Sequence, residues 1–265
     1  MGFGWGIFGA SFATVLAQLI AFLLCLRSLR RLPFVQLTKA DWKTDPAILL
    51  HLCRLGIPTG LQMSMITLGG MVLQSVLNGF GVVFVAGYTA ANKLYGILES
   101  ASVAFGYAMT AYMGQNRGAR NAARIDAGIR AVLVLSAEFT AAIVTAMLVA
   151  GKPLLGLFLS TEEAGAADAL AVAYQYLMVL MAFLFALFML QAYRSSLQGL
   201  GEMTVPTLSG FAEMLMRMGA ALVLPTFIGQ SGVFFAEGAA WVCAAALNLV
   251  WYYMQIGKIK RDMLK

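Results

Sequence analysis

Seven long apolar stretches limit what this sequence can fold into more than any other feature. They cover residues 3–26, 56–79, 83–114, 129–150, 171–193, 205–228 and 233–256. A helix needs about 20 apolar residues to cross the hydrocarbon core of a bilayer, and every stretch meets that length. The sequence therefore predicts an all-α integral membrane protein, a polytopic bundle of about seven transmembrane helices.

Composition excludes the soluble classes. Hydrophobic residues make up 61% of the 265-residue chain and charged residues 11%, less than half of the roughly one quarter that is usual in soluble domains. The mean hydropathy is +0.82. A soluble domain of this size still needs a large polar surface, which so few charges do not supply.

Residues that could support covalent catalysis or bind a metal are scarce. His51 is the only histidine, and Cys25, Cys53 and Cys243 lie far apart without a C-x-x-C motif. No catalytic triad or nucleotide-binding loop occurs in a suitable context. We therefore expect no enzymatic activity, no metal site and no resident cofactor.

Lysine and arginine predict the orientation. If the helices alternate in direction, fifteen of the 18 basic residues fall on one side, which the positive-inside rule assigns to the cytoplasm. These are Arg27, Arg30, Arg31, Lys39, Lys43, Arg54, Arg117, Arg120, Arg124, Arg130, Arg194, Lys258, Lys260, Arg261 and Lys265. The opposite side has Lys152 with Glu162, Glu163 and Asp168. We expect a multi-pass protein of the plasma (inner) membrane with a cytoplasmic C-terminus.

The segment YMGQNRGARNAAR, residues 112–124, is rich in arginine and could suggest a phosphate or nucleic-acid loop. Its arginines belong to the cytoplasmic set, so topology explains them and no nucleic-acid partner is expected. They remain available to anionic lipid headgroups.

The same topology places Met1 outside, with no basic residue before Arg27. That is unusual for a natural start, so we expect an upstream half to be missing. The polar segment 27–54 connects the first stretch to the others. Trp42, Phe34 and Leu32 among basic residues suggest an interfacial segment, and a plain cytoplasmic linker is equally compatible.

Ionisable residues inside the apolar stretches are costly in lipid, so each predicts a cavity or a partner. Glu213 and Arg217 lie four residues apart on one helical face and are expected to pair. Lys93 can extend its amine toward the outer surface. Glu237 is close enough to that surface to be interfacial.

Glu99 and Glu138 are the other carboxylates within the stretches. Glu99 lies six residues after Lys93 and does not share its face, so it is predicted to be unpaired. An unpaired carboxylate in mid-membrane is a candidate carrier of a proton or a cation. Glu138 is expected to point toward a neighbouring helix.

Polar residues also cluster on the second and third stretches. Gln62, Gln74, Asn78, Asn92 and Tyr95 could line a path for a substrate. Hydrogen bonding between helices explains each of them equally well.

Several segments, in order and with matching spacing, resemble the multidrug and toxic compound extrusion (MATE) family. They include LGIPTGLQMSMITLGGMVLQSVLNGFG (55–81), VAGYTAANKLYGILES (85–100), AMTAYMGQNRGARNAARIDAGIR (108–130) and SSLQGLGEMTVP (195–206). The resemblance implies twelve helices in two six-helix lobes that export cationic or amphiphilic compounds in exchange for Na⁺ or H⁺. On this mapping, residues 1–26 are the last helix of a first lobe whose remainder is missing. Residues 27–54 connect the lobes, 55–257 form the second lobe, and 258–265 are a basic cytoplasmic tail.

The chain departs from the family pattern at two positions. Where the resemblance implies an acidic residue on the seventh and tenth helices of the family, this chain has Ile66 and Leu187. Any coupling carboxylate would then be Glu99, Glu213 or a residue of the missing lobe.

The resemblance favours secondary efflux of cationic or amphiphilic molecules by alternating access, here in a partial chain. Its expected partners are the bilayer, drug-like substrates and the missing lobe, and its coupling ion is H⁺ or Na⁺. The alternatives are a flippase or exporter of lipid-linked precursors, and a truncated membrane subunit that does not transport.

Overall fold

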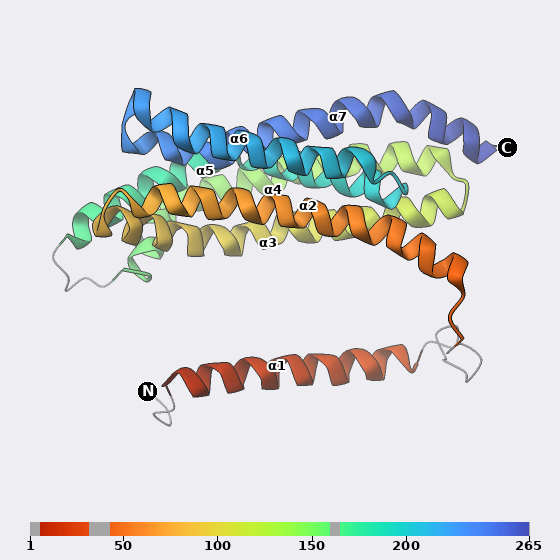
Figure 1. Cartoon of the computed structure of the whole chain (residues 1–265), viewed down its shortest axis with the longest axis horizontal. Helices are drawn as coiled ribbons and strands as arrows, with labels where there is room; N and C mark the ends of the chain where they lie inside the picture. Colours follow the sequence, from red (N-terminus) through yellow and green to blue (C-terminus); the bar gives the residue numbers. More distant parts are fainter. Residues whose placement is uncertain (1–5, 32–42, 160–164, 265) are drawn as a thin grey trace. The chain divides into compact units, whose positions relative to one another are not determined.

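Helices account for all the regular structure in the described part of the chain. The computed structural model describes residues 6–31, 43–159 and 165–264 (Figure 1). Its elements are α1 (Gly6–Leu29), α2 (Pro46–Asn78), α3 (Val82–Gly118), α4 (Ala122–Gly156), α5 (Ala166–Gly199), α6 (Thr204–Ile228), the short 3₁₀ helix η3 (Gln230–Phe234) and α7 (Phe235–Leu264). Seven long helices thus coincide with the seven apolar stretches, and the predicted all-α membrane fold is confirmed.

The chain divides into two compact units, residues Met1–Leu52 and Cys53–Lys265. The first contains α1 and the opening turns of α2. The second contains the rest of α2 and α3 to α7, and the site described below lies wholly within it. The predicted division at residues 26, 54 and 257 is not tested by this partition and stays a prediction.

Six of the helices are long and apolar enough to cross a membrane, counting only the described residues. The seventh, α3, is 37 residues long but falls short in apolarity because it carries Lys93, Glu99 and several polar side chains. Large hydrophobic residues are exposed along the helices, among them Phe227 and Val149. Such a surface suits lipid and not water. The protein is therefore a multi-pass membrane protein.

Several helices extend beyond the predicted stretches, because apolarity marks only the part of a helix that meets hydrocarbon. α2 begins at Pro46, inside the predicted connection 27–54, and Asp45 Oδ1 accepts a hydrogen bond of 2.8 Å from the Ala47 amide. α4 begins seven residues early, where the Asn121 side chain caps it by accepting from the Arg124 amide at 3.1 Å. Trp42, Phe34 and Leu32 lie outside the described residues, so the nature of that connection stays open.

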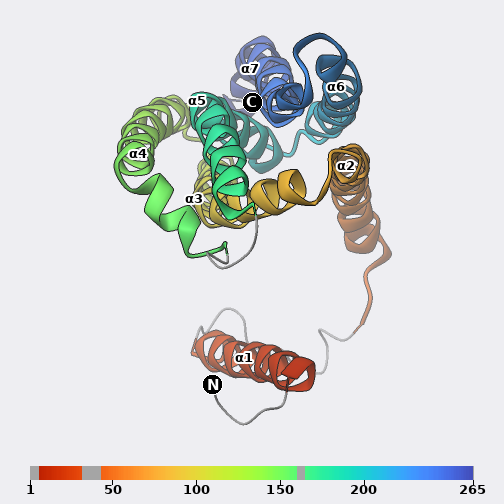
Figure 2. The same cartoon turned by 90° about the vertical axis from the view of Figure 1, so that its left-hand side faces the viewer.

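The closest packing in the second unit joins α3 and α5, which lie side by side (Figure 2). Small residues permit this approach. A Cβ atom at Gly199 would lie 3.0 Å from the Met113 Cβ, and one at Gly106 would lie 2.8 Å from the Ser195 Oγ. The rings of Tyr88 and Tyr176 stack between the same helices with centroids 4.5 Å apart.

α2 approaches α6 through glycines as well. A Cβ atom at Gly69 would lie 3.3 Å from the Met214 Cα, and one at Gly210 would lie 3.3 Å from the Gln62 Cα. The Thr207 hydroxyl of α6 also donates to the Pro58 carbonyl of α2 at 3.3 Å. These contacts close one side of a polar cavity in the unit.

Candidate functional site

A cavity of about 350 Å³ lies within the second unit. Five helices contribute to its wall: α2, α3, α5, α6 and α7. Its lining residues are Thr59, Gln62, Met63, Ile66, Glu99, Val103, Tyr107, Thr110, Leu187, Leu190, Gln191, Arg194, Ser195, Gln198, Glu213, Arg217 and Trp241. Apolar, polar and charged side chains therefore meet at one place inside a membrane bundle.

Four charged side chains form one connected network at this cavity, which we call the buried quartet: Arg194, Glu213, Arg217 and Glu237. Glu213 bridges the two arginines, with Oε2 2.6 Å from Arg194 Nη2 and Oε1 3.0 Å from Arg217 Nη2. Arg217 Nη2 also lies 2.8 Å from Glu237 Oε2. The quartet joins α5, α6 and α7.

The quartet is balanced in charge and shielded from solvent. Its two arginines and two glutamates cancel, and the side chains of Arg194, Glu213 and Arg217 are 4–7% exposed. Arg217 Nη1 also donates to the Ile66 carbonyl of α2 at 3.0 Å. Buried charges persist only where partners and hydrogen bonds offset their desolvation. The quartet is thus a stable unit as long as all four charges are present.

Glu99 differs from the carboxylates of the quartet. It lines the cavity from α3 and is half-buried, yet within the described residues it forms no ion pair. Tyr95 lies one helical turn before it on the same helix. The cavity therefore contains one carboxyl group whose charge no cationic side chain cancels at short range.

Polar and aromatic groups complete the wall. The Gln198 amide donates to the Gln62 carbonyl oxygen at 3.1 Å, linking α5 to α2. Trp241 lines the cavity from α7 and stacks on Tyr95, with ring centroids 5.5 Å apart. The wall of the cavity therefore includes an aromatic side chain as well as a carboxyl group.

The structure brings some predicted cavity residues together and not others. Gln62 lines the cavity, and Tyr95 lies buried behind Trp241. Gln74 and Asn78 are exposed and bond to each other at 3.0 Å. Asn92 is exposed too, and none of these three lines the cavity. Their assignment to a substrate path stays a prediction.

The remaining charged residues of the apolar stretches lie away from the cavity. Lys93 is exposed on α3, and Glu138 is exposed on α4 and enters no ion pair among the described residues. Glu138 was expected to point toward a neighbouring helix, and that expectation stays a prediction. The pairing expected of Glu213 and Arg217 appears as the 3.0 Å contact within the quartet.

Two expectations from the sequence are wrong. Arg194 was assigned to a cytoplasmic turn, but α5 continues to Gly199 and buries it. Glu237 was expected to be interfacial, but it pairs with Arg217. The helix-ending signal on α5 is Gly201, whose φ of 74° only glycine adopts readily. That glycine could have placed Arg194 inside the helix.

Ile66 and Leu187 both line the cavity. These are the positions where the family resemblance implies acidic residues. In this chain the carboxylates at the cavity come from other helices, Glu99 from α3 and Glu213 from α6. Of these two, Glu213 is paired with Arg194 and Arg217, and Glu99 forms no ion pair among the described residues.

Comparison with known proteins gives a consistent picture. A family model described as MatE matches residues 58–223. The probable multidrug resistance protein YpnP of Bacillus subtilis (strain 168) is 29% identical over 94% of this chain and 55% of its own length. YoeA of the same organism, also named a probable multidrug resistance protein, is 26% identical over 98% of this chain and 56% of its own length. The chain thus spans a little over half the length of these relatives.

Solved structures share the fold. A crystal structure of MATE in complex with MaL6 matches with a TM-score of 0.86 at 22% identity, over 97% of this chain and 58% of that one. A MOP superfamily transporter from Pyrococcus furiosus, described as having a binding pocket of reverse polarity, matches with a TM-score of 0.87 at 23% identity, over 97% of this chain and 58% of that one.

Proposed function

This chain belongs to the MATE family of membrane transporters, and on that premise we propose that it forms part of a secondary efflux transporter for cationic or amphiphilic small molecules. Two relatives, YpnP and YoeA, are both named probable multidrug resistance proteins, which supports this class of activity. The family matches also indicate a transporter and not an enzyme. The observation that carries the proposal is the unpaired carboxyl group of Glu99 in the cavity.

We infer that Glu99 binds the coupling proton and the substrate cation in turn. The quartet cancels its own charges, so it leaves Glu99 as the group whose net charge changes when a cation or a proton arrives. Trp241 supplies an aromatic face for the apolar part of a substrate. Alternating access then requires that the two ligands compete for one carboxylate in different conformations.

We propose H⁺ and not Na⁺ as the coupling ion. A single carboxyl group can carry a proton unaided, whereas hard metal cations take several oxygen ligands. Among the described residues, no group of three or more histidine, cysteine or acidic side chains is arranged to hold a metal ion. Glu99 is therefore better suited to carrying a proton than to binding a sodium ion.

The test compares Glu99→Gln with Glu138→Gln. Glu138 is a matched control, because it is also a carboxylate inside a long helix but lies outside the cavity. Each variant is made in a full-length protein that joins this chain to the first lobe expected from the resemblance, and it is expressed in a bacterial host whose own efflux pumps are deleted. Efflux of a panel of cationic dyes is then measured under imposed pH gradients. We expect Glu99→Gln to lose gradient-driven efflux and Glu138→Gln to keep it. Equal activity in the two variants would remove Glu99 from the mechanism.

The same experiment separates the alternative functions. A flippase for lipid-linked precursors would be favoured by a basic cavity, and Arg194 and Arg217 do line this one. Both are already paired with carboxylates, so the cavity offers no free positive charge. Failure of the wild-type protein to move any cationic dye would contradict efflux and leave the flippase or a non-transporting subunit.

A further inference from the structure

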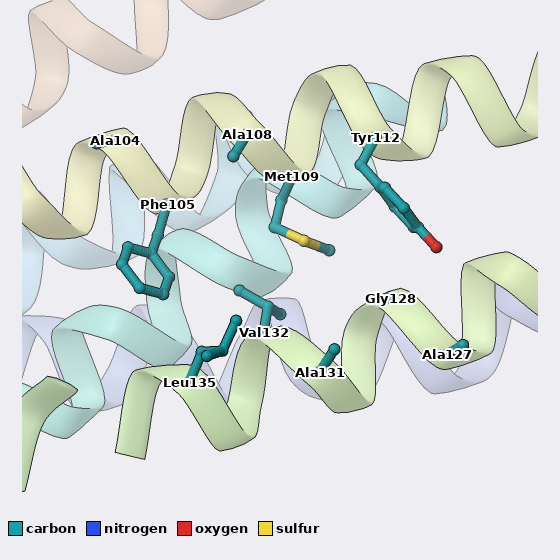
Figure 3. Close-up of a pocket in the computed structure, with 10 residues that line it drawn as sticks. All are labelled: Ala104, Phe105, Ala108, Met109, Tyr112, Ala127, Gly128, Ala131, Val132 and Leu135. Atoms are coloured by element: carbon teal, nitrogen blue, oxygen red, sulfur yellow. The ribbon is translucent and has the colours of Figure 1, made fainter. Parts of the chain in front are cut away.

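A second concavity lies on the opposite face of α3 from the cavity. It is a groove of about 540 Å³ between α3 and α4. Figure 3 shows Phe105 and Met109 of α3 pointing toward Val132 and Leu135 of α4 across it. Small residues, Ala104, Ala108, Ala127, Gly128 and Ala131, form much of the rest of its wall. The groove is therefore apolar and open to the outside of the bundle.

Charge differs between the two ends of the groove. Arg124 precedes Gly128 by four residues and Ala131 by seven, so it lies on the groove face of α4 at the arginine-rich end, and it is exposed. Tyr112 lines the same end, and its hydroxyl donates to the Arg124 carbonyl at 3.0 Å. At the other end, Glu138 follows Leu135 by three residues on the same face and is also exposed.

We propose that this groove binds a single anionic phospholipid, with an acyl chain between α3 and α4 and its phosphate group on the Arg124 guanidinium. The apolar wall suits hydrocarbon, and the arginine complements a phosphate. Tyr112 lies two residues before the end of the predicted apolar stretch 83–114, where aromatic residues commonly meet the headgroup region. Arg120, in the exposed turn before α4, adds to the positive charge at this end.

This site explains features that the efflux mechanism does not use. A Cβ atom at Gly128 would collide with the Tyr112 ring, so only glycine there lets the ring lie across α4 and bound the groove. The arginine-rich segment 112–124 then has a ligand as well as a topological role. The site is independent of Glu99, since α3 separates it from the cavity.

The test is a lipid titration followed by native mass spectrometry of the purified chain in detergent. Phosphatidylglycerol and phosphatidylcholine with identical acyl chains are the probes. The variants are Arg124→Gln, which removes the phosphate contact, and Ala131→Leu, which fills the groove from an exposed position. Arg261→Gln is the matched control, because Arg261 is an exposed arginine of α7 that does not line the groove.

We expect wild type to retain phosphatidylglycerol in preference to phosphatidylcholine. Arg124→Gln should lower phosphatidylglycerol affinity about fivefold, the contribution of one basic residue near an anionic headgroup. Ala131→Leu should weaken both lipids, and Arg261→Gln should change neither. Thermal unfolding of each variant verifies that it is folded. Unchanged lipid binding in Arg124→Gln and Ala131→Leu would overturn the proposal. So would a dimer that Ala131→Leu dissociates, because the groove would then be a protein interface.

Discussion

The buried quartet gives the sharpest prediction about stability. In Glu213→Gln the side chain keeps its shape but loses its charge. Arg217 retains Glu237 at 2.8 Å, whereas Arg194 loses the only carboxylate that it contacts in the described structure. An arginine whose side chain is 7% exposed is then left with an uncompensated charge. Removing one partner of a buried ion pair costs about 3–5 kcal/mol.

The quartet also predicts that a second substitution repairs the first. Arg194→Met alone leaves Arg217 facing two carboxylates and should likewise destabilise the protein. The double variant Arg194→Met/Glu213→Gln removes one charge of each sign and leaves the balanced pair of Arg217 and Glu237. The loss of unfolding free energy in the double variant should be well below the sum of the losses in the two single variants. The difference, the coupling energy, should be roughly 1–3 kcal/mol.

Thermal unfolding of the detergent-solubilised protein measures these differences. At roughly 2–4 °C per kcal/mol for a chain of this size, Glu213→Gln should lower the midpoint by about 6–20 °C. Glu138→Gln, an exposed carboxylate without an ion pair, should leave it unchanged. If the losses of the two single variants simply add in the double variant, the four residues do not act as a network and the reasoning fails.

Two further predictions concern packing and surface charge. Gly199→Ala should cost about 1–3 kcal/mol by forcing α5 away from α3, whereas Gly96→Ala, where an added Cβ meets nothing within 4 Å, should be neutral or stabilising in the same unfolding assay. Asp126→Asn removes the ion pair with Lys260. The Asp126 side chain is 44% exposed and the Lys260 side chain 25%. The substitution should cost less than about 1 kcal/mol, and a larger loss that persists in high salt would show that the pair is structural.

The fold was predictable because lipid imposes a simple requirement on sequence. Each helix needs a long apolar run, so all seven could be located without any tertiary information. The ends of the helices could not be located in this way, because a helix can continue into the headgroup region beyond its apolar residues. α2 begins at Pro46 for this reason, ten residues before its apolar stretch.

The site was only partly predictable, for a related reason. The four-residue spacing of Glu213 and Arg217 is a local signal, and it placed both residues on one face. Arg194 and Glu237 join them from other helices, and no spacing along the chain encodes contacts between α5, α6 and α7. Arg194 was also missed because the apolar run ends beside it, and only Gly201 further along the chain marks the end of the helix.

The structure also separates the two carboxylates that sequence alone left as equal candidates for coupling. Glu213 lies between two guanidinium groups, and a proton bound there would leave two buried cations sharing Glu237 alone. Such a state is costly, so Glu213 is poorly suited to gain and lose a proton in every transport cycle. Protonation of Glu99 leaves the ion pairs of the quartet intact, because the quartet is neutral without Glu99. Glu213→Gln should therefore lose stability and efflux together, whereas Glu99→Gln should lose efflux with its unfolding midpoint nearly unchanged. A Glu99→Gln protein as unstable as Glu213→Gln would place Glu99 inside the structural network and leave the chain without a coupling carboxylate in this cavity.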